Sequence, residues 1–321
     1  MFRYLTLLII AASIVLPRVT ATGGPAPAAA APPAADDDPR PCSLLTPDLP
    51  RSDECDAEIA ANPLPEFERP IEYDAVRDGE ATPRSILMPE EPLPYPIAQQ
   101  RRAWYFSDVP GVLPADDDWT AARRVAREEM SYVYHTVDVN GVIWHLIGPG
   151  MWMEDQYTSV LVVPNRPDEV RGRWVAIDLN QQTLIAFEDD TPILASLVST
   201  GYFLQTTPGL FHVYARTEGM VMRGPPGANP PEYEFYTRWV MFFNADQGLH
   251  AMPYHNYFGI ARTHGCINVP PGDEEWLWNF FAENEDEWHP SFPDTFQVDD
   301  IDAAPWVYIY ESDSIPAAWS Y

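Results

Sequence analysis

The chain has 321 residues, enough for two or three domains, and 46% of them are hydrophobic, enough for well-packed cores. Its formal net charge of −29 argues against binding to nucleic acid or to an anionic membrane surface, because both need a basic face.

The first 21 residues are typical of an export signal. Arg3 supplies a basic start, residues 4–16 form an apolar run, and Val19-Thr20-Ala21 offers a small-residue cleavage site. The alternative is an uncleaved membrane anchor, but the run is short for a membrane span, so we expect cleavage and no stable span afterwards. Residues 22–41 are rich in Ala and Pro and are expected to form a disordered linker.

Residues 42–100 are acidic and rich in proline, which predicts an irregular segment. Two of the three cysteines, Cys42 and Cys55, lie in this segment, and in an exported protein they are expected to form a disulfide. Cys266 is then left over. A leftover cysteine in a secreted protein is reactive or intermolecular, the alternative being an inert buried thiol.

Residues 101–165 predict a small β module. Asn140-Gly141 is a strong hairpin signal between residues 132–137 and 142–147, and Gly148-Pro149-Gly150 marks a second turn. A strand with Trp144, a tight glycine turn and a second strand with Trp152 resemble bacterial SH3-like modules, which implies a small β-barrel. His135 and His145 are expected to be surface or core residues of this module rather than ligands.

Residues 171–311 predict a mainly β domain with one short helix, followed by a tail, 312–321. The helix is expected to begin at Asp273, because Asp is a good N-cap and acids suit the first turn. The predicted strands are residues 173–179, 183–188, 192–199, 210–214, 238–243 and 306–310.

A nucleophile, a base and a flexible backbone position lie together in His264-Gly265-Cys266. A thiol attacks only as a thiolate, and a neighbouring imidazole is the commonest group that takes its proton. Residues two apart face the same side of an extended segment, so His264 and Cys266 are expected to meet. Gly265 leaves the backbone open, so that its N–H can approach a substrate carbonyl.

Three stretches of residues 173–310 resemble the L,D-transpeptidase (YkuD) catalytic domain. They are residues 177–184, residues 198–201 with Thr207-Pro208-Gly209, and His250 followed by Thr263-His264-Gly265-Cys266-Ile267-Asn268. The last is the most specific. Thr263 stands where many members have Ser, and Ala251 stands where many have Gly after the upstream histidine. The resemblance implies a β-sandwich with a catalytic cysteine in a groove, preceded here by the SH3-like module.

The resemblance also implies the chemistry. Cys266 would attack the bond between a meso-diaminoacid and D-Ala in a peptidoglycan stem peptide, releasing D-Ala and leaving a thioester, which an amine of a second stem would resolve into a cross-link. His264 is expected to be the base, and N–H groups near Gly265 and Cys266 to hold the oxyanion. Residues expected to bind substrate are His250, Tyr254, His255, Asn256, Arg262, Thr263 and Asn268. No cofactor is expected, and the site is expected to work outside the cytoplasm, in the cell wall or periplasm.

Several alternatives stay open. Water in place of the amine gives an L,D-carboxypeptidase with the same residues. A non-enzymatic wall-binding protein would not need the His-Gly-Cys element. Papain-like and NlpC-type peptidases place the cysteine before the histidine, which is the opposite order. A zinc site of His250, His255, His264 and Cys266 fits no standard spacing, so no metal is expected.

Overall fold

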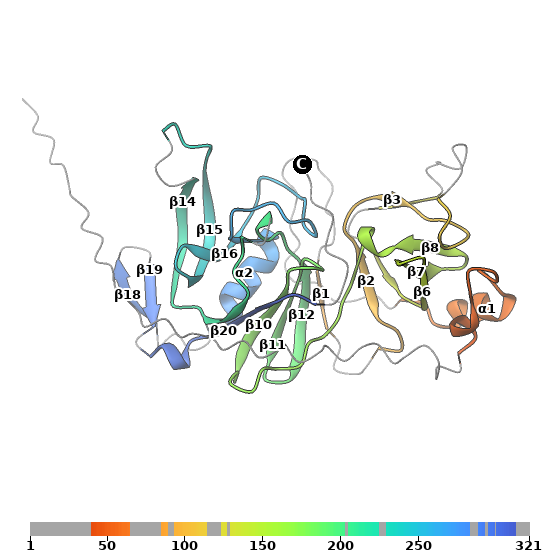
Figure 1. Cartoon of the computed structure of the whole chain (residues 1–321). Helices are drawn as coiled ribbons and strands as arrows, with labels where there is room; N and C mark the ends of the chain where they lie inside the picture. Colours follow the sequence, from red (N-terminus) through yellow and green to blue (C-terminus); the bar gives the residue numbers. More distant parts are fainter. Residues whose placement is uncertain are drawn as a thin grey trace, which may run out of the picture.

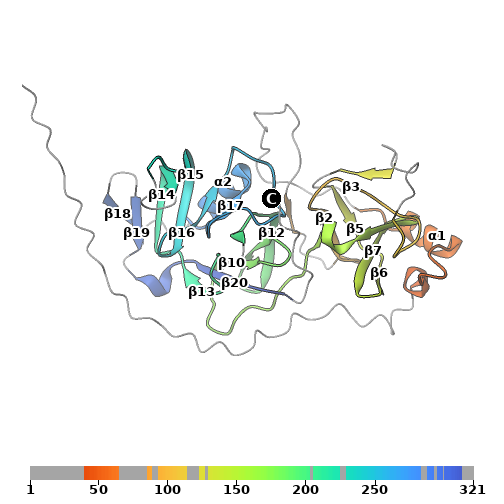
Figure 2. The ribbon, with the colours of Figure 1, turned by 45° about the horizontal axis from the view of Figure 1, so that its top comes forward.

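The computed structural model of the chain describes residues 40–64, 85–88, 93–113, 123–126, 129–202, 205–224, 229–282, 288–292, 295–298 and 300–312. Two bodies lie side by side (Figures 1 and 2). We call the described residues from 40 to 64 and from 93 to 160 the N-terminal body, and those from 85 to 88 and from 170 to 312 the sandwich. The predicted export signal, most of the linker and nearly all of the tail lie outside the described residues.

The N-terminal body consists of short elements around small sheets. Its sheets have the strand orders β5-β2-β9, β3-β4 and β6-β7-β8. The bounds are η2 (Pro41–Leu44), α1 (Asp53–Ala61), β2 (Ile97–Gln100), β3 (Trp104–Tyr105), β4 (Arg124–Val125), β5 (Met130–Tyr132), β6 (His135–Val139), β7 (Val142–Gly148), β8 (Met151–Glu154), η4 (Asp155–Tyr157) and β9 (Thr158–Val160).

Asn140 and Gly141 form the two-residue turn between β6 and β7, both with positive φ, as a type I′ hairpin requires. The predicted closure into a barrel is not seen, because the pairings among the described strands leave three separate sheets. The resemblance to SH3-like modules therefore stays a prediction.

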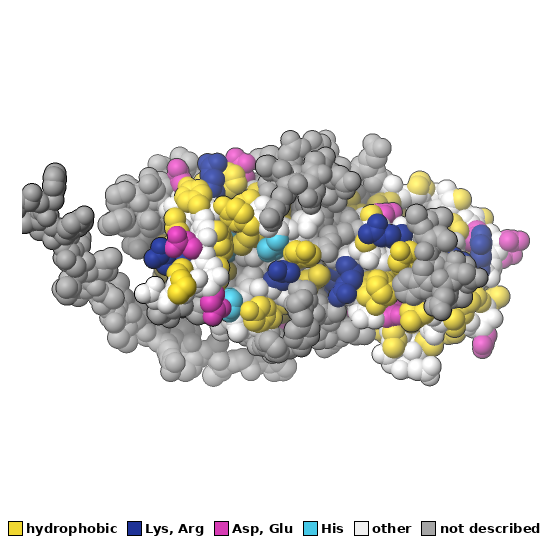
Figure 3. Space-filling view, turned by 90° about the horizontal axis from the view of Figure 1, so that it is seen from above, with side chains coloured by type: hydrophobic (Ala, Val, Ile, Leu, Met, Phe, Trp, Pro, Cys, Tyr) yellow, Lys and Arg dark blue, Asp and Glu magenta, His cyan; other side chains and the backbone are white. Residues whose placement is uncertain are grey.

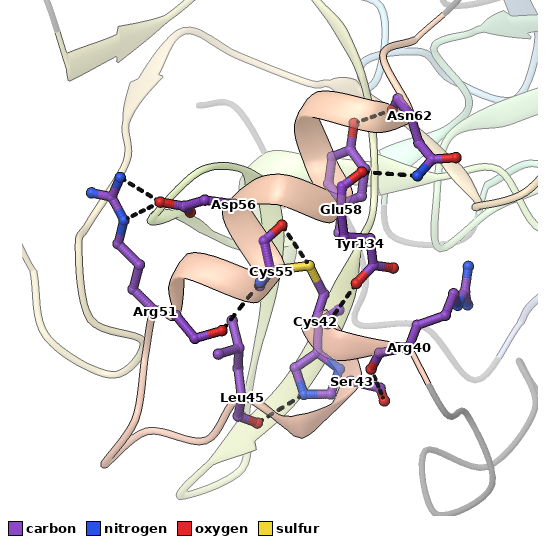
Figure 4. Close-up of a disulfide and its surroundings, with 12 residues drawn as sticks. Arg40, Cys42, Ser43, Leu45, Arg51, Cys55, Asp56, Glu58, Asn62 and Tyr134 are labelled. Carbon is purple, nitrogen blue, oxygen red and sulfur yellow. Dashed lines mark hydrogen bonds and ion pairs between the residues drawn. A yellow bond between two sulfur atoms is a disulfide. The ribbon is translucent and has the colours of Figure 1, made fainter.

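The segment predicted to be irregular contains a helix. Ser52 caps α1 by accepting a hydrogen bond from the Cys55 N–H, and acidic residues fill the first turn. A disulfide joins Cys42 to Cys55 and ties α1 to the preceding turn (Figure 4). Glu58 of α1 accepts the Cys42 N–H at 2.7 Å. The sequence did not predict this helix, because it is rich in charged residues and has no apolar stripe. The N-cap and the disulfide stabilise it instead.

The sandwich has two six-stranded sheets, with strand orders β1-β12-β11-β10-β20-β13 and β17-β16-β15-β14-β19-β18. The bounds of the first sheet are β1 (Ser85–Leu87), β10 (Arg173–Asp178), β11 (Thr183–Glu188), β12 (Thr191–Leu197), β13 (Gly209–His212) and β20 (Trp306–Tyr310). Those of the second sheet are β14 (Ala215–Gly224), β15 (Tyr233–Asn244), β16 (Gln247–Ala251), β17 (Ile267–Val269), β18 (Trp288–Phe292) and β19 (Thr295–Val298). The remaining elements are α2 (Pro271–Phe280) and η7 (Ile301–Ala303).

One apolar core lies between the two sheets. It joins Val175 and Ile177 of β10 to Leu249 of β16 and Ile267 of β17, and α2 adds Leu277. The predicted β-sandwich is therefore confirmed. The helix begins at Pro271, two residues earlier than predicted, because proline suits the first helical position. The long strand β14 was not predicted from the sequence.

Alternate residues of the first sheet point away from this core. Trp174 and Phe187 stack there at 4.0 Å between ring centroids and belong to a second apolar cluster, which continues into the N-terminal body through Tyr95 and Trp144. The two bodies thus share a continuous apolar contact.

Candidate active site

Cys266 directly precedes β17, on the outer face of the second sheet. Leu249 and Ile267 point into the sandwich core, so the alternate positions on the same strands point outward. His250 of β16 pairs with Asn268 of β17 in parallel register, and Cys266 precedes Asn268 by two residues. His250, Cys266 and Asn268 therefore share one face.

The Cys266 thiol is partly buried and protonated at rest. Burial raises its pKa, and the nearby Asp246 adds to that shift, while a hydrogen bond from the Gly248 N–H opposes it. Its sulfur lies 3.6 Å from the Asp246 carbonyl oxygen. Such a thiol needs a base during attack, because its thiolate is not formed beforehand.

His250 is buried and held in one tautomer. Its Nδ1 lies 3.0 Å from the Ala251 carbonyl oxygen, which only accepts, so Nδ1 carries the proton and donates. Nε2 then has a free lone pair, and among the described residues no hydrogen-bond donor meets it. Burial lowers the pKa of His250 to about 4, so the imidazole is neutral at pH 7. The Nε2 lone pair of this neutral imidazole can accept a proton, and burial makes it a weaker base than an ordinary histidine.

His264 is exposed, and its ring contacts Tyr202 and Tyr233. Its Nε2 lies 3.1 Å from the Tyr202 hydroxyl, and Tyr233 stacks on its ring with centroids 5.8 Å apart. Among the described residues, no hydrogen bond joins the side chain of His264, the predicted base, to the Cys266 thiol. Gly265 has φ +133°, which breaks the alternation assumed for an extended segment.

The residues around Gly265 hold the nucleophile loop tightly. The Thr263 hydroxyl accepts the Gly265 N–H at 3.1 Å and donates to the Cys266 carbonyl at 2.5 Å. Thr206 donates to the Gly265 carbonyl at 2.9 Å. The Gly265 N–H is thus already used, and it is not available as the predicted oxyanion donor. For the Cys266 N–H, by contrast, no acceptor is found among the described residues.

The other predicted substrate-binding residues gather in the loop between β16 and β17. His255 Nε2 lies 3.0 Å from the side-chain amide of Asn268, and its Nδ1 accepts the Tyr257 N–H. The exposed Arg262 lies with its guanidinium 4.4 Å from the Tyr257 ring centroid. Tyr254 is half exposed and touches Phe235, and Asn256 is partly buried in the same loop.

The hairpin of β14 and β15 forms an aromatic wall that the sequence did not reveal. Tyr233 lies beside His264, Phe235 lies 6.1 Å from the His250 ring, and the hydroxyl of Thr237 lies 3.5 Å from His250 Nδ1. Alternation along β15 puts all three on one face, which was not evident while the strand was predicted to begin at residue 238. Seen from above, a histidine side chain borders a basic and several hydrophobic side chains near the middle of the face (Figure 3).

Among the described residues, no group of three or more His, Cys, Asp or Glu is placed to hold a metal ion. Within the same ranges, no helix is long and apolar enough to cross a membrane.

Residues 172–291 match the family model of the L,D-transpeptidase catalytic domain. No curated protein matches the chain. Among solved structures, similar ones include an L,D-transpeptidase from Stackebrandtia nassauensis, with 21% identity and a TM-score of 0.31 over 44% of this chain and 57% of that one. An L,D-transpeptidase from Mycobacterium smegmatis has 16% identity and a TM-score of 0.34 over 60% of this chain and 75% of that one. The catalytic domain of the Enterococcus faecium L,D-transpeptidase has 19% identity and a TM-score of 0.33 over 44% of this chain and 98% of that one.

Proposed function

Because residues 172–291 match the L,D-transpeptidase catalytic-domain family, we propose that this chain is a peptidoglycan L,D-transpeptidase with Cys266 as its nucleophile. The observation that carries the proposal is the placement of Cys266 on the same sheet face as His250, whose Nε2 is open and whose Nδ1 is fixed by a carbonyl. A nucleophile, a base and a group that orients the base are the three parts that acyl transfer from a thiol requires.

In the first step the sulfur of Cys266 attacks the carbonyl carbon between the diaminoacid and D-Ala. Its proton moves to Nε2 of His250, which replaces His264 as the proposed base. The Cys266 N–H stabilises the oxyanion. When the carbon–nitrogen bond breaks, His250 returns the proton to the amine of D-Ala, and a thioester remains.

In the second step an amine of another stem peptide attacks the thioester. His250 takes the proton of the attacking amine, the carbon–sulfur bond breaks, and the proton returns to the thiolate. The products are a new amide bond and free Cys266. Peptidoglycan is the proposed partner, and the proposed location is therefore the cell wall or periplasm.

His264 is proposed to shape the groove rather than to transfer protons. Tyr202 and Tyr233 fix its ring, so it forms one wall next to the nucleophile. Tyr254, His255, Asn256 and Arg262 of the loop, together with Asn268 of β17, form the proposed substrate-binding surface, and Arg262 is proposed to bind a carboxylate of the stem peptide.

The proposal is tested by incubating the purified protein with a disaccharide-tetrapeptide and analysing the products by mass spectrometry. Cross-linked dimers with release of D-Ala are the expected result. Tripeptide and D-Ala alone, at high concentrations of donor and acceptor, would make the protein an L,D-carboxypeptidase. A protein that binds the fragments without cleaving any would be the wall-binding alternative.

A further inference from the structure

Arg101 is a buried cation between the two bodies. It directly follows β2, a strand on the side of the N-terminal body that faces the sandwich (Figures 1 and 2), and only 1% of Arg101 is exposed. Burial lowers the pKa of its guanidinium to about 10, while Asp155 of the N-terminal body and Asp178 of the sandwich favour the charged form. A guanidinium stays protonated at pH 7 even so. Among the described residues its Nη1 and Nη2 meet no hydrogen-bond acceptor, so Asp155 and Asp178 stabilise the buried charge electrostatically.

Hydrogen bonds lead from Arg101 into the sandwich. Arg101 Nε donates to the Ser159 hydroxyl at 2.6 Å, which donates to the Gln181 carbonyl at 2.6 Å. The next residue, Gln182, holds Thr200 with both ends of its amide: Nε2 donates to the Thr200 hydroxyl at 2.7 Å, and Oε1 accepts the Thr200 N–H at 2.9 Å. All of these residues are buried, so breaking one of their hydrogen bonds would leave a buried polar group without a partner, which costs free energy.

Thr200 in turn holds the segment that carries the nucleophile. Its carbonyl accepts the N–H groups of Arg262 at 2.8 Å and of Thr263 at 2.9 Å. Thr263 then fixes the Gly265 N–H and the Cys266 carbonyl through its hydroxyl. A continuous series of contacts therefore joins Arg101 to the backbone of Cys266.

Arg101 also packs directly against the loop between β16 and β17. Gly259 in this loop has φ +84°, and a Cβ there would lie 3.2 Å from both Cα and Cγ of Arg101. The Gly259 N–H donates to the Val198 carbonyl at 2.8 Å. The loop is thus held between the end of β12 and Arg101, close to the residues proposed to bind substrate.

We propose that Arg101 is a positioning residue for acyl transfer, and that the N-terminal body is a fixed support of the active site rather than only a spacer. The inference rests on the proposed function for its kinetic readout. The test measures the coupling between Arg101 and the segment that carries Cys266.

The test compares Arg101→Met, Arg101→Lys and Ser159→Ala in the full chain, with Arg124→Ala, an exposed arginine on β4 of the same body, as the matched control. The rate of Cys266 acylation by the tetrapeptide donor, its kcat and KM, and hydrogen exchange of peptides covering residues 198–202 and 259–266 are measured. Thermal melting identifies variants that fail to fold.

Arg101→Met is expected to lower kcat about tenfold, because displacements on the order of 1 Å at a reacting centre reduce rates strongly. Exchange in both peptides should rise. Arg101→Lys is expected to keep part of the rate that Arg101→Met loses, since the lysine ammonium can donate to Ser159. In the double variant Arg101→Met/Ser159→Ala, the fold-loss of rate is expected to be smaller than the product of the two single losses. Arg124→Ala should match the wild type.

Wild-type kcat and exchange in a folded Arg101→Met protein would overturn the inference. A double variant whose loss of rate equals the product of the two single losses would overturn it as well. If Arg101→Met does not fold, Ser159→Ala and Arg101→Lys carry the same comparison. If the wild type itself shows no acylation, the proposed function fails, and the exchange measurements still decide whether Arg101 supports the nucleophile loop.

Discussion

His250 is expected to set the acid limb of the pH dependence of acylation. Burial lowers its pKa to about 4, so about nine-tenths of the imidazole is neutral at pH 5, and nearly all of it at pH 7. A base with the ordinary histidine pKa of about 6.5 would be only about 3% neutral at pH 5. The acylation rate should therefore change less than twofold between pH 7 and pH 5, instead of falling more than twentyfold.

The same pKa predicts how stability depends on pH. Between about pH 6.5 and pH 4 the unfolded chain binds a proton at this residue that the folded chain excludes, so stability is lost as the pH falls through this window. The loss from His250 is at most about 3 kcal/mol and about 2 kcal/mol at pH 5. Near-ultraviolet circular dichroism at each pH must accompany the rates, so that unfolding is not mistaken for titration of the base.

The assay is rapid-quench mass spectrometry of the acyl-enzyme at saturating donor, with His250→Gln and His264→Gln as a matched pair. Loss of a general base typically reduces rates by about 10²- to 10⁴-fold, so this is the expected effect of His250→Gln, whereas His264→Gln should lose less than about tenfold. A fall of more than twentyfold between pH 7 and pH 5 in folded protein, or a larger loss in His264→Gln than in His250→Gln, would refute the assignment of His250.

Three further predictions concern the residues around the nucleophile and the disulfide. Gly265→Ala should lower stability by about 1–3 kcal/mol and reduce acylation more than tenfold, because its Cβ would lie 3.0 Å from Gln247 Nε2 at a left-handed φ; a wild-type denaturant midpoint would contradict this. Thr263→Val should cost about 1–3 kcal/mol through lost hydrogen bonds to the loop, while Thr263→Ser should keep the wild-type melting temperature; equal melting of both variants would show that the hydroxyl is dispensable. In non-reduced protein, a thiol reagent should label Cys266 alone, and peptide mapping that finds label on Cys42 or Cys55 would exclude their disulfide in solution.

The strands were the most predictable part of this chain. The strands 183–188 and 306–310 end where predicted, because turn residues and alternating apolar residues bound them on both sides. The Asn140-Gly141 turn followed equally directly from its need for positive φ. The helix α1 could not be read in the same way, since its apolar positions are few.

The proposed role of His250 as the base could not be predicted from the sequence. His264 and Cys266 are two residues apart, and alternation predicts that they face the same side, but Gly265 turns the backbone between them. His250 reaches the face of Cys266 only through the parallel pairing of β16 with β17, a contact between residues far apart in the chain. The aromatic wall of β15 and the support from Arg101 depend on similar non-local contacts.

The central claim is that Cys266 forms a thioester with the donor stem peptide, and intact-protein mass spectrometry tests it most directly. Wild-type protein incubated with a tetrapeptide donor is expected to gain the mass of the tripeptide acyl group, with release of D-Ala, and peptide mapping should place the adduct on Cys266. Cys266→Ala, folded as judged by circular dichroism, should gain no mass. An adduct of the same mass on Cys266→Ala, or D-Ala release by that variant at the wild-type rate, would contradict the account.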